Sequence, residues 1–580
     1  MAGARVTRSL LADLDDDQRV VAETLRGPVC VLAGAGTGKT RAITHRIAHG
    51  VATGTYAANR LLALTFTNRA AAELRGRLRH LGAGNVPAKT FHSAALSQLG
   101  YFWPQVVGGD MPRLVEGKAR ILGHAAEKLK LGVDTATLRD LAAEVEWRKV
   151  SGRSIEQYAD AGRPLPGRLD IEQTVAMLQT YEDLKDERRL IDFEDVLLSC
   201  AGMLEQEPRV AMQVREQYRF FVVDEYQDVS PLQQQLLDLW LGDRRELCVV
   251  GDASQTIFSF AGASSTFLLG FGARYDGANV VRLERNYRSS QPIVTTANRL
   301  MRERPGALTL KAAGASGDEP ALDPDLVRYH NDMAEARGIA QSILVRIEAG
   351  ARPEDIAVLY RVNAQAAVLE TALGDVGVSY HVRGSTRFFD RPEVKRAILA
   401  LRGASVSVSD EPLFKSVSDV LRSLGWSQIP PEGQGAVRSA WELLNALMGL
   451  VDQAPPGTTF REFTDDLLER QAGQHEPTMQ AVTLATLHSA KGLEWDEVYL
   501  PGLSEGLIPI SYARSFDQID EERRLLYVGI TRARRRVTIT WSEEGQRRPR
   551  ERSRFLQEIG IRNPDAVGAR PPAAGRRATP

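Results

Sequence analysis

The sequence predicts an α/β protein with two doubly wound parallel-sheet domains, each interrupted by a mainly helical insertion. Residues 29–44, VCVLAGAGTGKTRAIT, read as a buried strand, a glycine-rich turn and a helix. Residues 219–231, RFFVVDEYQDVSP, read as an aromatic and β-branched strand that ends in paired acids. A later series of short apolar runs predicts a second sheet. The length of 580 residues agrees with several domains, at about 150 residues each.

The turn after the first strand is typical of a loop that binds phosphate. Its three glycines, within residues 34–38, allow backbone N–H groups to converge on a polyphosphate at the start of a helix. Lys39 would reach the β- and γ-phosphates, and Thr40 would ligate Mg²⁺. The strict pattern begins with glycine, and this chain has Ala33 there. A glycine turn that binds nothing is the alternative for an isolated match.

The paired acids supply the second half of a nucleotide site. Asp224 can hold Mg²⁺, and Glu225 can polarise an attacking water. Paired acids after a strand are often a helix N-cap, but one ATPase core explains both these acids and the phosphate loop. Gln255 follows the next predicted strand, at residues 247–250, where a γ-phosphate sensor could lie.

Five apolar runs, residues 280–283, 356–360, 482–486, 498–500 and 537–540, predict the strands of the second domain. Two basic loops belong to this part of the chain. ERNYRSS carries Tyr287 and Arg288, and RLLYVGITRARRR carries Arg532. Charge runs are usually solvated faces, but arginines in both loops could stabilise transition-state charge on phosphate across a domain cleft.

Aromatic residues follow several of the predicted strands. Phe66 and His92 lie in strand-to-helix turns, and Phe258 and Phe260 lie two apart in a glycine-flanked loop. Such rings can stack on unpaired bases, and polar side chains near them in the sequence can contact phosphates. For each ring alone, ordinary core packing or helix capping is the alternative.

Composition excludes several classes of protein. The formal net charge of −1 does not indicate a nucleic-acid binder, so any basic binding track must be local. Three widely spaced cysteines exclude a CxxC pair and favour a reducing cytoplasm over a disulfide framework. The N-terminus has no apolar signal region and no apolar run is long enough for a bilayer, so we expect a cytoplasmic protein with no membrane partner.

Changes in pattern along the chain predict the domain limits. Residues 1–94 and 191–282 are expected to form the first, ATP-binding domain, and residues 95–190 its helical insertion. Residues 283–383 and 481–560 are expected to form the second domain, and residues 384–480 a second, shorter helical insertion. The Arg- and Pro-rich tail, residues 561–580, is expected to be disordered.

Together these stretches resemble the UvrD/Rep/PcrA family of superfamily 1A DNA helicases. The resemblance covers about residues 14–559 and keeps the family's order and spacing. Within the family the chain is most similar to the second actinobacterial UvrD-type paralogue, and we expect it to be without that paralogue's C-terminal four-cysteine and HRDC regions. The matching stretches are GAGTGKTR, TFTNRAA, TFHS, VVDEYQD, VVGDASQ, NYRSS, LYRVNAQ, LATLHSAKGLE and EERRLLYVGITRA.

The resemblance implies two RecA-like (P-loop) motor domains that use ATP and Mg²⁺ and bind single-stranded DNA and 3′-tailed duplex, with repair proteins as partners. The implied nucleotide contacts are Gln18, Ala33, Gly34, Ala35, Gly36, Thr37, Gly38, Lys39, Thr40, Arg41, Tyr287 and Glu494. The implied catalytic residues are Lys39, Asp224, Glu225, Gln255, Arg288 and Arg532, with Thr40 and Asp224 as the metal ligands. The implied DNA contacts are Phe66, His92, Phe193, Phe258, Phe260 and His488.

Three departures from the family pattern affect the expected activity. The usual Tyr and Trp are Phe258 and Phe260, and the arginine that normally follows is Ala261. The usual Phe-Pro-His near the GLE stretch reads Ile508, Pro509, Ile510, which removes a DNA contact. The second insertion is also shorter than in the best-known members.

The resulting hypothesis is an ATP-dependent helicase that moves 3′ to 5′ on single-stranded DNA and unwinds duplex in repair or recombination. The departures favour an alternative, a translocase that strips proteins from single strands with little unwinding. A nucleotide-gated DNA-binding module without productive hydrolysis is a third hypothesis, against which Lys39, Glu225, Arg288 and Arg532 argue. A fused nuclease is disfavoured because little chain follows residue 559.

Overall fold

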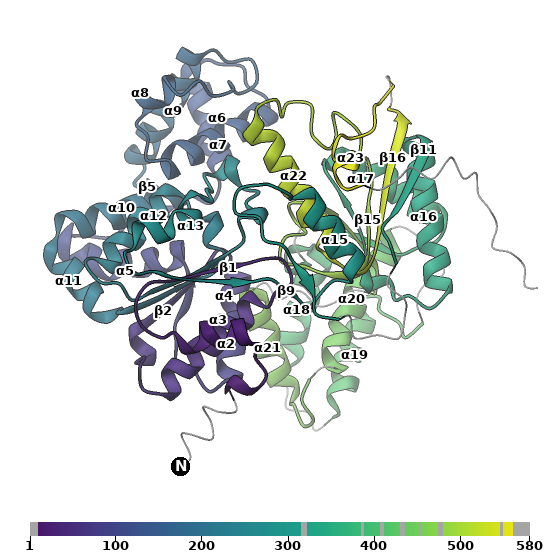
Figure 1. Cartoon of the computed structure of the whole chain (residues 1–580), viewed down its shortest axis with the longest axis horizontal. Coiled ribbons are helices and arrows are strands. Elements are labelled where there is room, and N and C mark those ends of the chain that lie inside the picture. Colours follow the sequence, from purple (N-terminus) through teal and green to yellow (C-terminus); the bar gives the residue numbers. More distant parts are fainter. Residues whose placement is uncertain are drawn as a thin grey trace, which may run out of the picture. The chain divides into compact units, whose positions relative to one another are not determined.

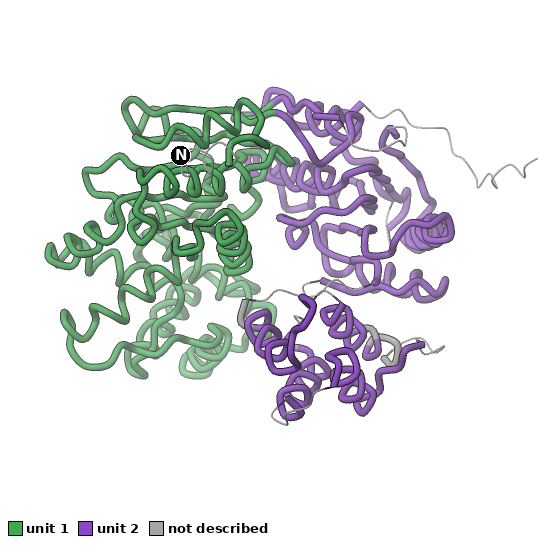
Figure 2. Tube along the Cα trace, turned by 90° about the horizontal axis from the view of Figure 1, so that it is seen from below, with its two compact units in different colours: residues 1–284, 305–308 green, residues 285–304, 309–580 purple. Residues whose placement is uncertain are grey.

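The structure, a computed structural model, describes residues 10–314, 322–383, 388–405, 411–429, 436–452, 454–473, 480–545 and 549–560. The tail 561–580, for which disorder is expected, lies outside these residues. The chain divides into two compact units, which Figure 2 colours separately. Unit 1 comprises residues 1–284 and 305–308, and unit 2 comprises residues 285–304 and 309–580.

Unit 1 contains a six-stranded sheet in the order β3-β2-β6-β7-β1-β8, in which every neighbouring pair is parallel. Because the strands are parallel, the segments that follow β1, β6 and β7 leave the sheet at the same edge. The strands are β1 (Val29–Ala33), β2 (Leu61–Thr65), β3 (Ala88–Thr90), β6 (Phe220–Val223), β7 (Leu247–Gly251) and β8 (Asn279–Leu283).

Helices cover both faces of this sheet, as Figure 1 shows. Alternate residues of β1 explain how: Val29 and Val31 pack with the core on one face, and Cys30 packs with the core on the other. Helices α2 (Asp16–Glu23), α3 (Lys39–Ala52) and α4 (Asn68–His80) contribute to the first core. Helices α5 (Phe91–Val106), α10 (Phe193–Gln206), α11 (Pro208–Gln217), α12 (Pro231–Leu241), α13 (Thr266–Leu269) and α14 (Phe271–Arg274) contribute to the second.

A helical group interrupts unit 1 between α5 and α10. It has a hydrophobic core of its own, in which Leu122, Leu141 and Met177 are completely buried. A short parallel pair, β4 (Arg113–Leu114) with β5 (Leu190–Ile191), joins its two ends. The helices are α6 (Lys118–Leu129), α7 (Thr135–Val150), α8 (Ile155–Ala159) and α9 (Ile171–Glu187).

Unit 2 contains a second six-stranded parallel sheet, in the order β11-β16-β15-β12-β14-β13. Helices α16 (Asp332–Glu348) and α17 (Ala366–Asp375) pack on one face of it. Helix α15 (Gln291–Leu300) contacts β16, helix α22 (Phe516–Ile530) contacts both β15 and β16, and the two helices contact one another. The strands are β11 (Asp325–Asn331), β12 (Ile356–Tyr360), β13 (Tyr380–Val382), β14 (Val482–Thr486), β15 (Trp495–Leu500) and β16 (Ala533–Glu544).

A second helical group interrupts unit 2 between β13 and β14. Apolar residues of its helices, among them Leu401, Leu421 and Leu447, form one separate core. The helices are α18 (Pro392–Ala404), α19 (Leu413–Ser423), α20 (Ala436–Asp452) and α21 (Phe460–Gly473). The unit also contains the parallel pair β9 (Arg285–Asn286) with β10 (Lys311–Ala312), and α23 (Phe555–Glu558).

The α/β fold with two parallel sheets is confirmed, but one strand prediction is wrong. Residues 280–283 belong to β8, which pairs with β1 in the first sheet instead of opening the second. The strand is also not buried as expected, since it lies at the sheet edge and Val280 is 45% exposed. The run 356–360 is confirmed as β12, while 498–500 and 537–540 lie inside the longer β15 and β16.

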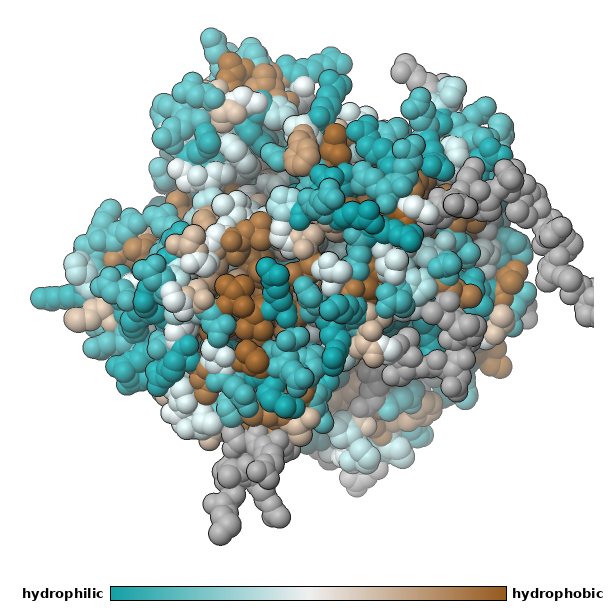
Figure 3. All heavy atoms as spheres, in the orientation of Figure 1, coloured by the Kyte–Doolittle hydropathy of each residue, from teal (hydrophilic) through white to brown (hydrophobic). Residues whose placement is uncertain are grey.

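Hydrophilic residues cover most of the face shown in Figure 3, with hydrophobic residues in smaller groups among them. None of the helices described by the structure combines the length and apolar character that a bilayer crossing requires. The three cysteines, Cys30, Cys200 and Cys248, are buried free thiols. Burial raises the pKa of both Cys30 and Cys200 to about 12, so these thiols stay protonated at neutral pH.

Candidate functional site

The phosphate loop of unit 1 connects β1 to α3. Gly36 and Gly38 have positive φ angles of 69° and 77°, which non-glycine residues rarely adopt. A Cβ atom at Gly38 would lie 2.6 Å from Nε2 of Gln18, so a side chain would also clash there. The loop is fixed internally, because Thr37 donates its hydroxyl to the Gly34 carbonyl at 2.9 Å. The glycine turn therefore has the backbone that a phosphate cradle requires.

The paired acids follow β6 at the same edge of the sheet. The Nζ of Lys39 lies 3.7 Å from Oε1 of Glu225, in an ion pair that is mostly shielded from solvent. Asp224 accepts from the Glu225 backbone N–H at 2.9 Å. Burial, reinforced by the neighbouring charge of Glu225, raises the pKa of Asp224 to about 7, although Lys39 opposes the shift. The structure thus brings together three of the predicted catalytic residues.

Gln227 connects these acids to the segment that follows β7. Its Nε2 donates to Oε2 of Glu225 at 2.5 Å, and its Oε1 accepts from the Asp252 backbone N–H at 2.9 Å. Asp252 in turn accepts from Nε2 of Gln255 at 2.7 Å. Gln227, Asp252 and Gln255 are all buried. We call Glu225, Gln227, Asp252 and Gln255 the carboxylate–amide cluster.

Gln227 and Asp252 were not among the predicted site residues, although both lie in the stretches that carry the prediction. The signal was present in the sequence: an amide two residues after Glu225 can donate and accept at once. What the sequence does not show is that β6 and β7 are neighbours, which brings the two segments together. Glu225 itself has a φ of 53°, a conformation that a non-glycine residue adopts at an energetic cost.

The predicted adenine contacts of unit 1 lie beside the loop. Gln18 is 2% exposed and donates through Nε2 to the Thr37 carbonyl at 3.0 Å. The Asp15 side chain caps α2 by accepting from the Gln18 backbone N–H at 2.7 Å, which fixes the start of this helix. Arg41 donates to the Asp13 carbonyl at 2.8 Å. Gln18 is therefore tied directly to the phosphate loop.

The predicted DNA contacts of unit 1 form two aromatic groups. Phe66 stacks on Phe258 with ring centroids 5.5 Å apart and planes 14° apart, and Phe260 meets Phe258 edge-on at 6.0 Å. Phe66 follows β2 and Phe258 comes after β7, at the same edge of the sheet as the phosphate loop. Phe260 is 55% exposed. One face of this row is thus open to solvent.

The second aromatic group joins His92, which follows β3, to Phe193, which begins α10. Their rings meet edge-on at 5.9 Å, and Phe193 is 52% exposed. Burial lowers the pKa of His92 to about 4, with a further contribution from Lys118. The buried Nε2 atom of His92 has no hydrogen-bond partner among the described residues. His92 is therefore neutral at pH 7, so it offers an aromatic face instead of a charge.

The predicted arginines of unit 2 lie close to each other. Arg288 donates through Nε to Oε2 of Glu494 at 2.5 Å and through Nη1 to the Thr531 carbonyl at 3.3 Å. The Thr531 side chain accepts from Nη2 of Arg532 at 3.3 Å, and Arg532 is 2% exposed. Arg532 also donates to the Leu493 carbonyl at 3.1 Å. Arg288, Glu494 and Arg532 are thus held in one cluster.

The turn that carries Arg288 is fixed by an asparagine that the sequence did not single out. The side-chain oxygen of Asn286 accepts from the backbone N–H groups of Arg288 and Ser289, at 2.9 and 2.7 Å. Tyr287, in the same turn, is 51% exposed. His488 follows β14 in unit 2, and burial, with the charges of Arg361 and Lys491, lowers its pKa to about 4.

The residues at the edge of the unit 1 sheet fit a nucleotide with a divalent cation. The loop has the positive glycine φ angles of a phosphate-binding turn directly before Lys39, and a bound cation would favour the ionised form of Asp224, whose pKa burial otherwise raises. Thr40, in the first turn of α3, supplies a hydroxyl at the position where such loops ligate Mg²⁺. The chemistry of these groups would suit a nucleoside triphosphate bound with a divalent cation.

Comparison with known proteins agrees with this geometry. Residues 14–276 match the model of the UvrD/REP helicase N-terminal domain. Residues 281–429 and 441–544 match the model of the UvrD-like helicase C-terminal domain. The two matches together cover most of the chain and include both six-stranded sheets.

Relatives are similar over nearly the full chain. The ATP-dependent DNA helicase UvrD2 of Mycobacterium tuberculosis is 47% identical over 576 residues, covering 95% of this chain and 82% of that protein. DNA helicase II of Escherichia coli is 29% identical, covering 95% of this chain and 88% of that protein. For the ATP-dependent DNA helicase PcrA of Bacillus subtilis the identity is 27%, with 96% and 86% covered. The chain belongs to the family of UvrD-like helicases.

Proposed function

We propose that the protein is an ATP-dependent DNA helicase that moves 3′ to 5′ along single-stranded DNA and unwinds duplex, in repair or recombination. The observation that carries this proposal is the placing of Lys39 and Glu225 3.7 Å apart at the edge where the phosphate loop leaves the sheet. Family membership and the names of the relatives, all ATP-dependent DNA helicases or DNA helicase II, support the same activity.

Each group in unit 1 then has a role in hydrolysis. Lys39 binds the β- and γ-phosphates, and Glu225 orients the attacking water and accepts its proton as the bond to the γ-phosphorus forms. The carboxylate–amide cluster holds Glu225 in place through Gln227 and gives Gln255 a fixed position. Arg288 and Arg532 of unit 2 are proposed to stabilise the charge that develops on the phosphate.

Thr40 and Asp224 would hold Mg²⁺, which supplies neutralisation of phosphate charge when bound. Gln18, Arg41 and Tyr287 are proposed to recognise adenine, with Tyr287 stacking on the base and Glu494 near the ribose. Tyr287 is 51% exposed, so part of its ring faces solvent, where a base can stack on it.

The aromatic residues are proposed to carry the DNA strand. Phe66, Phe258 and Phe260 form a continuous row with an exposed end, as a stacking platform for bases requires. His92 and Phe193 extend the contact surface on unit 1, and His488 is the proposed contact on unit 2. Phe258 lies three residues after Gln255, a member of the carboxylate–amide cluster. A structural change at the γ-phosphate can therefore reach the aromatic row through one short segment of chain.

A second candidate function is a translocase that clears proteins from single strands but opens duplex weakly. Ala261 and Ile510 stand where the family pattern has side chains that contact DNA or ATP, and neither can donate a side-chain hydrogen bond. The two candidates share the hydrolysis site and differ only in the yield of separated strands.

ATP turnover with and without a single-stranded oligonucleotide tests both motor functions against a passive binding module. We expect phosphate release to rise strongly when the oligonucleotide is added. Turnover that is absent under both conditions would favour a module that binds DNA without productive hydrolysis.

Phe260→Ala is expected to weaken the coupling of DNA to hydrolysis. The substitution removes the exposed ring of the row, and base stacking on such a ring contributes about 1–3 kcal/mol. The oligonucleotide concentration for half-maximal stimulation should rise about tenfold or more, while turnover without DNA is unchanged. Phe516→Ala, at an exposed ring of α22 in unit 2, is the control. Unaltered stimulation of the Phe260 variant would argue against the proposed row.

Gln227→Leu is expected to lower kcat with little change in the KM for ATP. Leucine keeps most of the volume but cannot orient Glu225 or satisfy the Asp252 backbone N–H. Hydrogen bonds to charged groups contribute about 1.5–3 kcal/mol, so we expect a loss of about tenfold or more in steady-state turnover. Gln206→Leu, at an exposed residue of α10, is the matched control. A kcat equal to that of the control would show that the cluster does not position Glu225.

A further inference from the structure

A pocket of about 840 Å³ lies on unit 1, away from the nucleotide loop. It is lined by α10, α11 and α12 and by the residues that immediately precede β6 and β7. The nucleotide site is built from the residues that follow β1, β6 and β7. Because the sheet is parallel, the pocket lies at the opposite edge and belongs to neither the hydrolysis site nor the aromatic row.

Three arginines line this pocket: Arg215, Arg219 and Arg244. None of them forms an ion pair with any carboxylate in the described part of the chain. Burial and the positive charges of the other two lower the pKa of Arg244, which shows that the three charges act on one another. Such a group of like charges is stabilised when an anion binds.

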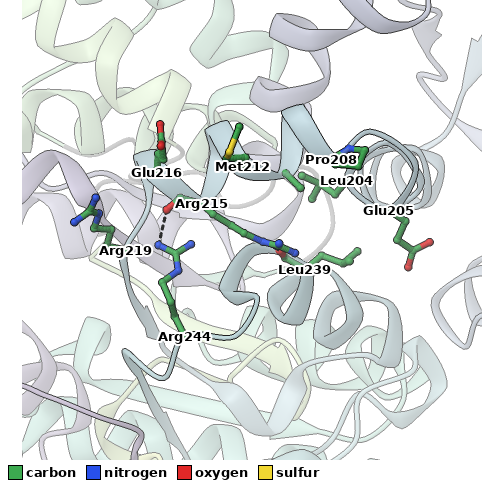
Figure 4. A pocket seen from close by; sticks show the side chains of 10 residues that line it. Leu204, Glu205, Pro208, Met212, Arg215, Glu216, Arg219, Leu239 and Arg244 are labelled. Atoms are coloured by element: carbon green, nitrogen blue, oxygen red, sulfur yellow. Dashed lines mark hydrogen bonds between the residues drawn. The ribbon is translucent and has the colours of Figure 1, made fainter.

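Two of the arginines are held in place by backbone carbonyls. Arg215 donates through Nε to the Leu239 carbonyl at 2.9 Å. Arg244 donates to the Leu241 carbonyl at 3.2 Å and to the Arg215 carbonyl, a bond drawn in Figure 4. Gly242 leaves room for this arrangement, since a Cβ there would lie 2.9 Å from Nε of Arg215. The cluster is thus preorganised before any ligand binds.

The rest of the pocket wall is apolar. Leu204, Met212 and Leu239 lie between the arginines and Glu205 in Figure 4. Met212 is 58% exposed, and an exposed methionine on a pocket wall can adapt to apolar side chains of different shapes. Glu205, which accepts from Gln235 at 2.8 Å, places a negative charge at the other end. The pocket therefore offers an anion site next to a short apolar surface.

We propose that this pocket is a docking site for a short acidic peptide segment of a partner protein, with a large apolar side chain next to its carboxylates. The arginines would bind the carboxylates, and the apolar wall would receive the neighbouring side chain. A nucleic-acid backbone fits less well, because Glu205 and Glu216 would repel a polyanion that spans the pocket and phosphates make no use of the apolar wall.

Fluorescence anisotropy with labelled peptides tests the proposal on the full chain. The probes are nine-residue peptides in which two or three aspartates or glutamates flank a leucine, methionine or phenylalanine. Matched peptides carry asparagine and glutamine in place of the acids, or serine in place of the apolar residue. A single-stranded oligonucleotide of the same charge is the third probe. We expect the acidic-apolar peptides to bind at least tenfold more tightly than either matched set.

Arg219→Glu is the main variant, because the Arg219 side chain makes no hydrogen bond or ion pair with the residues that the structure describes, so none of these is lost. It should weaken peptide binding at least tenfold, whereas Arg209→Glu, on an exposed residue of α11 outside the pocket lining, should change it less than twofold. Met212→Ser should weaken the binding of the peptides that carry an apolar residue and leave the binding of the matched serine peptides unchanged. Neither pocket variant should alter ATP turnover, which separates this test from that of the proposed function.

Three results would overturn the proposal. The first is that no acidic-apolar peptide binds better than its neutral match, and the second is that Arg219→Glu binds the peptide as tightly as Arg209→Glu does. The third is that the oligonucleotide competes with the peptide and is the probe whose binding Arg219→Glu weakens most. The last result would assign the pocket to nucleic acid. Arg219 is exposed, and its backbone N–H donates to the Arg60 carbonyl, a hydrogen bond that the substitution leaves in place. Loss of folding therefore cannot account for a weakened variant that retains its ATP turnover.

Discussion

Glu225→Gln is expected to reduce ATP turnover by about 100- to 10,000-fold, the usual contribution of a general base. Glutamine keeps the size of the side chain and can still accept one hydrogen bond, but it cannot take the proton of the attacking water. Gln227 holds the Glu225 carboxylate at 2.5 Å, and Lys39 lies 3.7 Å from it. We therefore expect the substitution to remove the base without any movement of the backbone.

Binding and turnover separate the roles of Glu225 and Lys39. Measured with a fluorescent ATP analogue, the affinity of Glu225→Gln should stay within about threefold of the wild-type value, since the substitution leaves Lys39, the proposed phosphate contact, in place. Lys39→Ala should lose both affinity and turnover, because it removes the phosphate ligand itself. Glu127→Gln, an exposed glutamate on α6 without an ion pair in the described chain, is the control. Substantial residual turnover in Glu225→Gln would remove the assignment of this residue as the base.

Lys149→Met is expected to destabilise unit 1 by about 3–5 kcal/mol, the cost of removing one partner from a buried ion cluster. Lys149 is 2% exposed and its Nζ lies 2.7 Å from Asp192, 2.6 Å from Asp195 and 3.0 Å from Glu182. Asp192 is also the N-cap of α10, which begins at Phe193 of the proposed DNA contacts. The ion cluster therefore joins the helical group of unit 1 to the helix that carries the proposed DNA contact.

Thermal unfolding should show this loss as a decrease of about 10 °C in the Tm of the affected transition. Lys185 contacts the same carboxylates and keeps part of the compensation, so the chain should still fold. Lys128→Met, which breaks an exposed ion pair with Glu187, should shift the Tm by about 2 °C or less. A Lys149 variant as stable as the Lys128 variant would show that the cluster does not hold the helical group in place.

The difference in Tm between Lys149→Met and the wild-type chain should depend on pH because of Asp192. Burial raises its pKa, but Lys149 and Lys185 outweigh burial and hold the pKa far below the ordinary value. A folded-state pKa that is depressed contributes stability above the unfolded-state pKa, and this stability is lost as pH falls through the folded-state pKa. In Lys149→Met the folded-state pKa rises, so the carboxyl protonates at mildly acidic pH and the penalty disappears. The Tm difference should therefore narrow between pH 7 and about pH 4.

The elements that carry the site could be predicted from the sequence because each has a local signal. The strand, glycine turn and helix of residues 29–44 and the strand before Asp224 are recognisable from a few consecutive residues, and the structure confirms them as β1, α3 and β6. β11 gave no such signal, since it is a half-exposed edge strand with polar residues, DLVRYHN. β13 also gave no signal, because a strand of only three residues is too short to show a periodic pattern.

What the sequence could not show is which segments become neighbours. Residues 280–283 follow the first set of strands in the chain, and only the pairing with β1 places them in unit 1. The same reason hid the bond between Gln227 and Asp252, which lie 25 residues apart, and the bond between Lys149 and Asp192, 43 residues apart. Motifs identify chemistry within one segment, whereas the cluster that positions Glu225 arises from the order of strands in the sheet.

Strand separation tests the central claim most directly. A duplex with a 3′ single-stranded tail, at limiting protein and with ATP and Mg²⁺, should be unwound by the wild-type chain and not by Glu225→Gln. A duplex with a 5′ tail should stay intact, because the proposed movement is 3′ to 5′. Failure to unwind the 3′-tailed duplex, in a preparation whose ATP turnover still responds to single-stranded DNA, would contradict the account and favour the translocase.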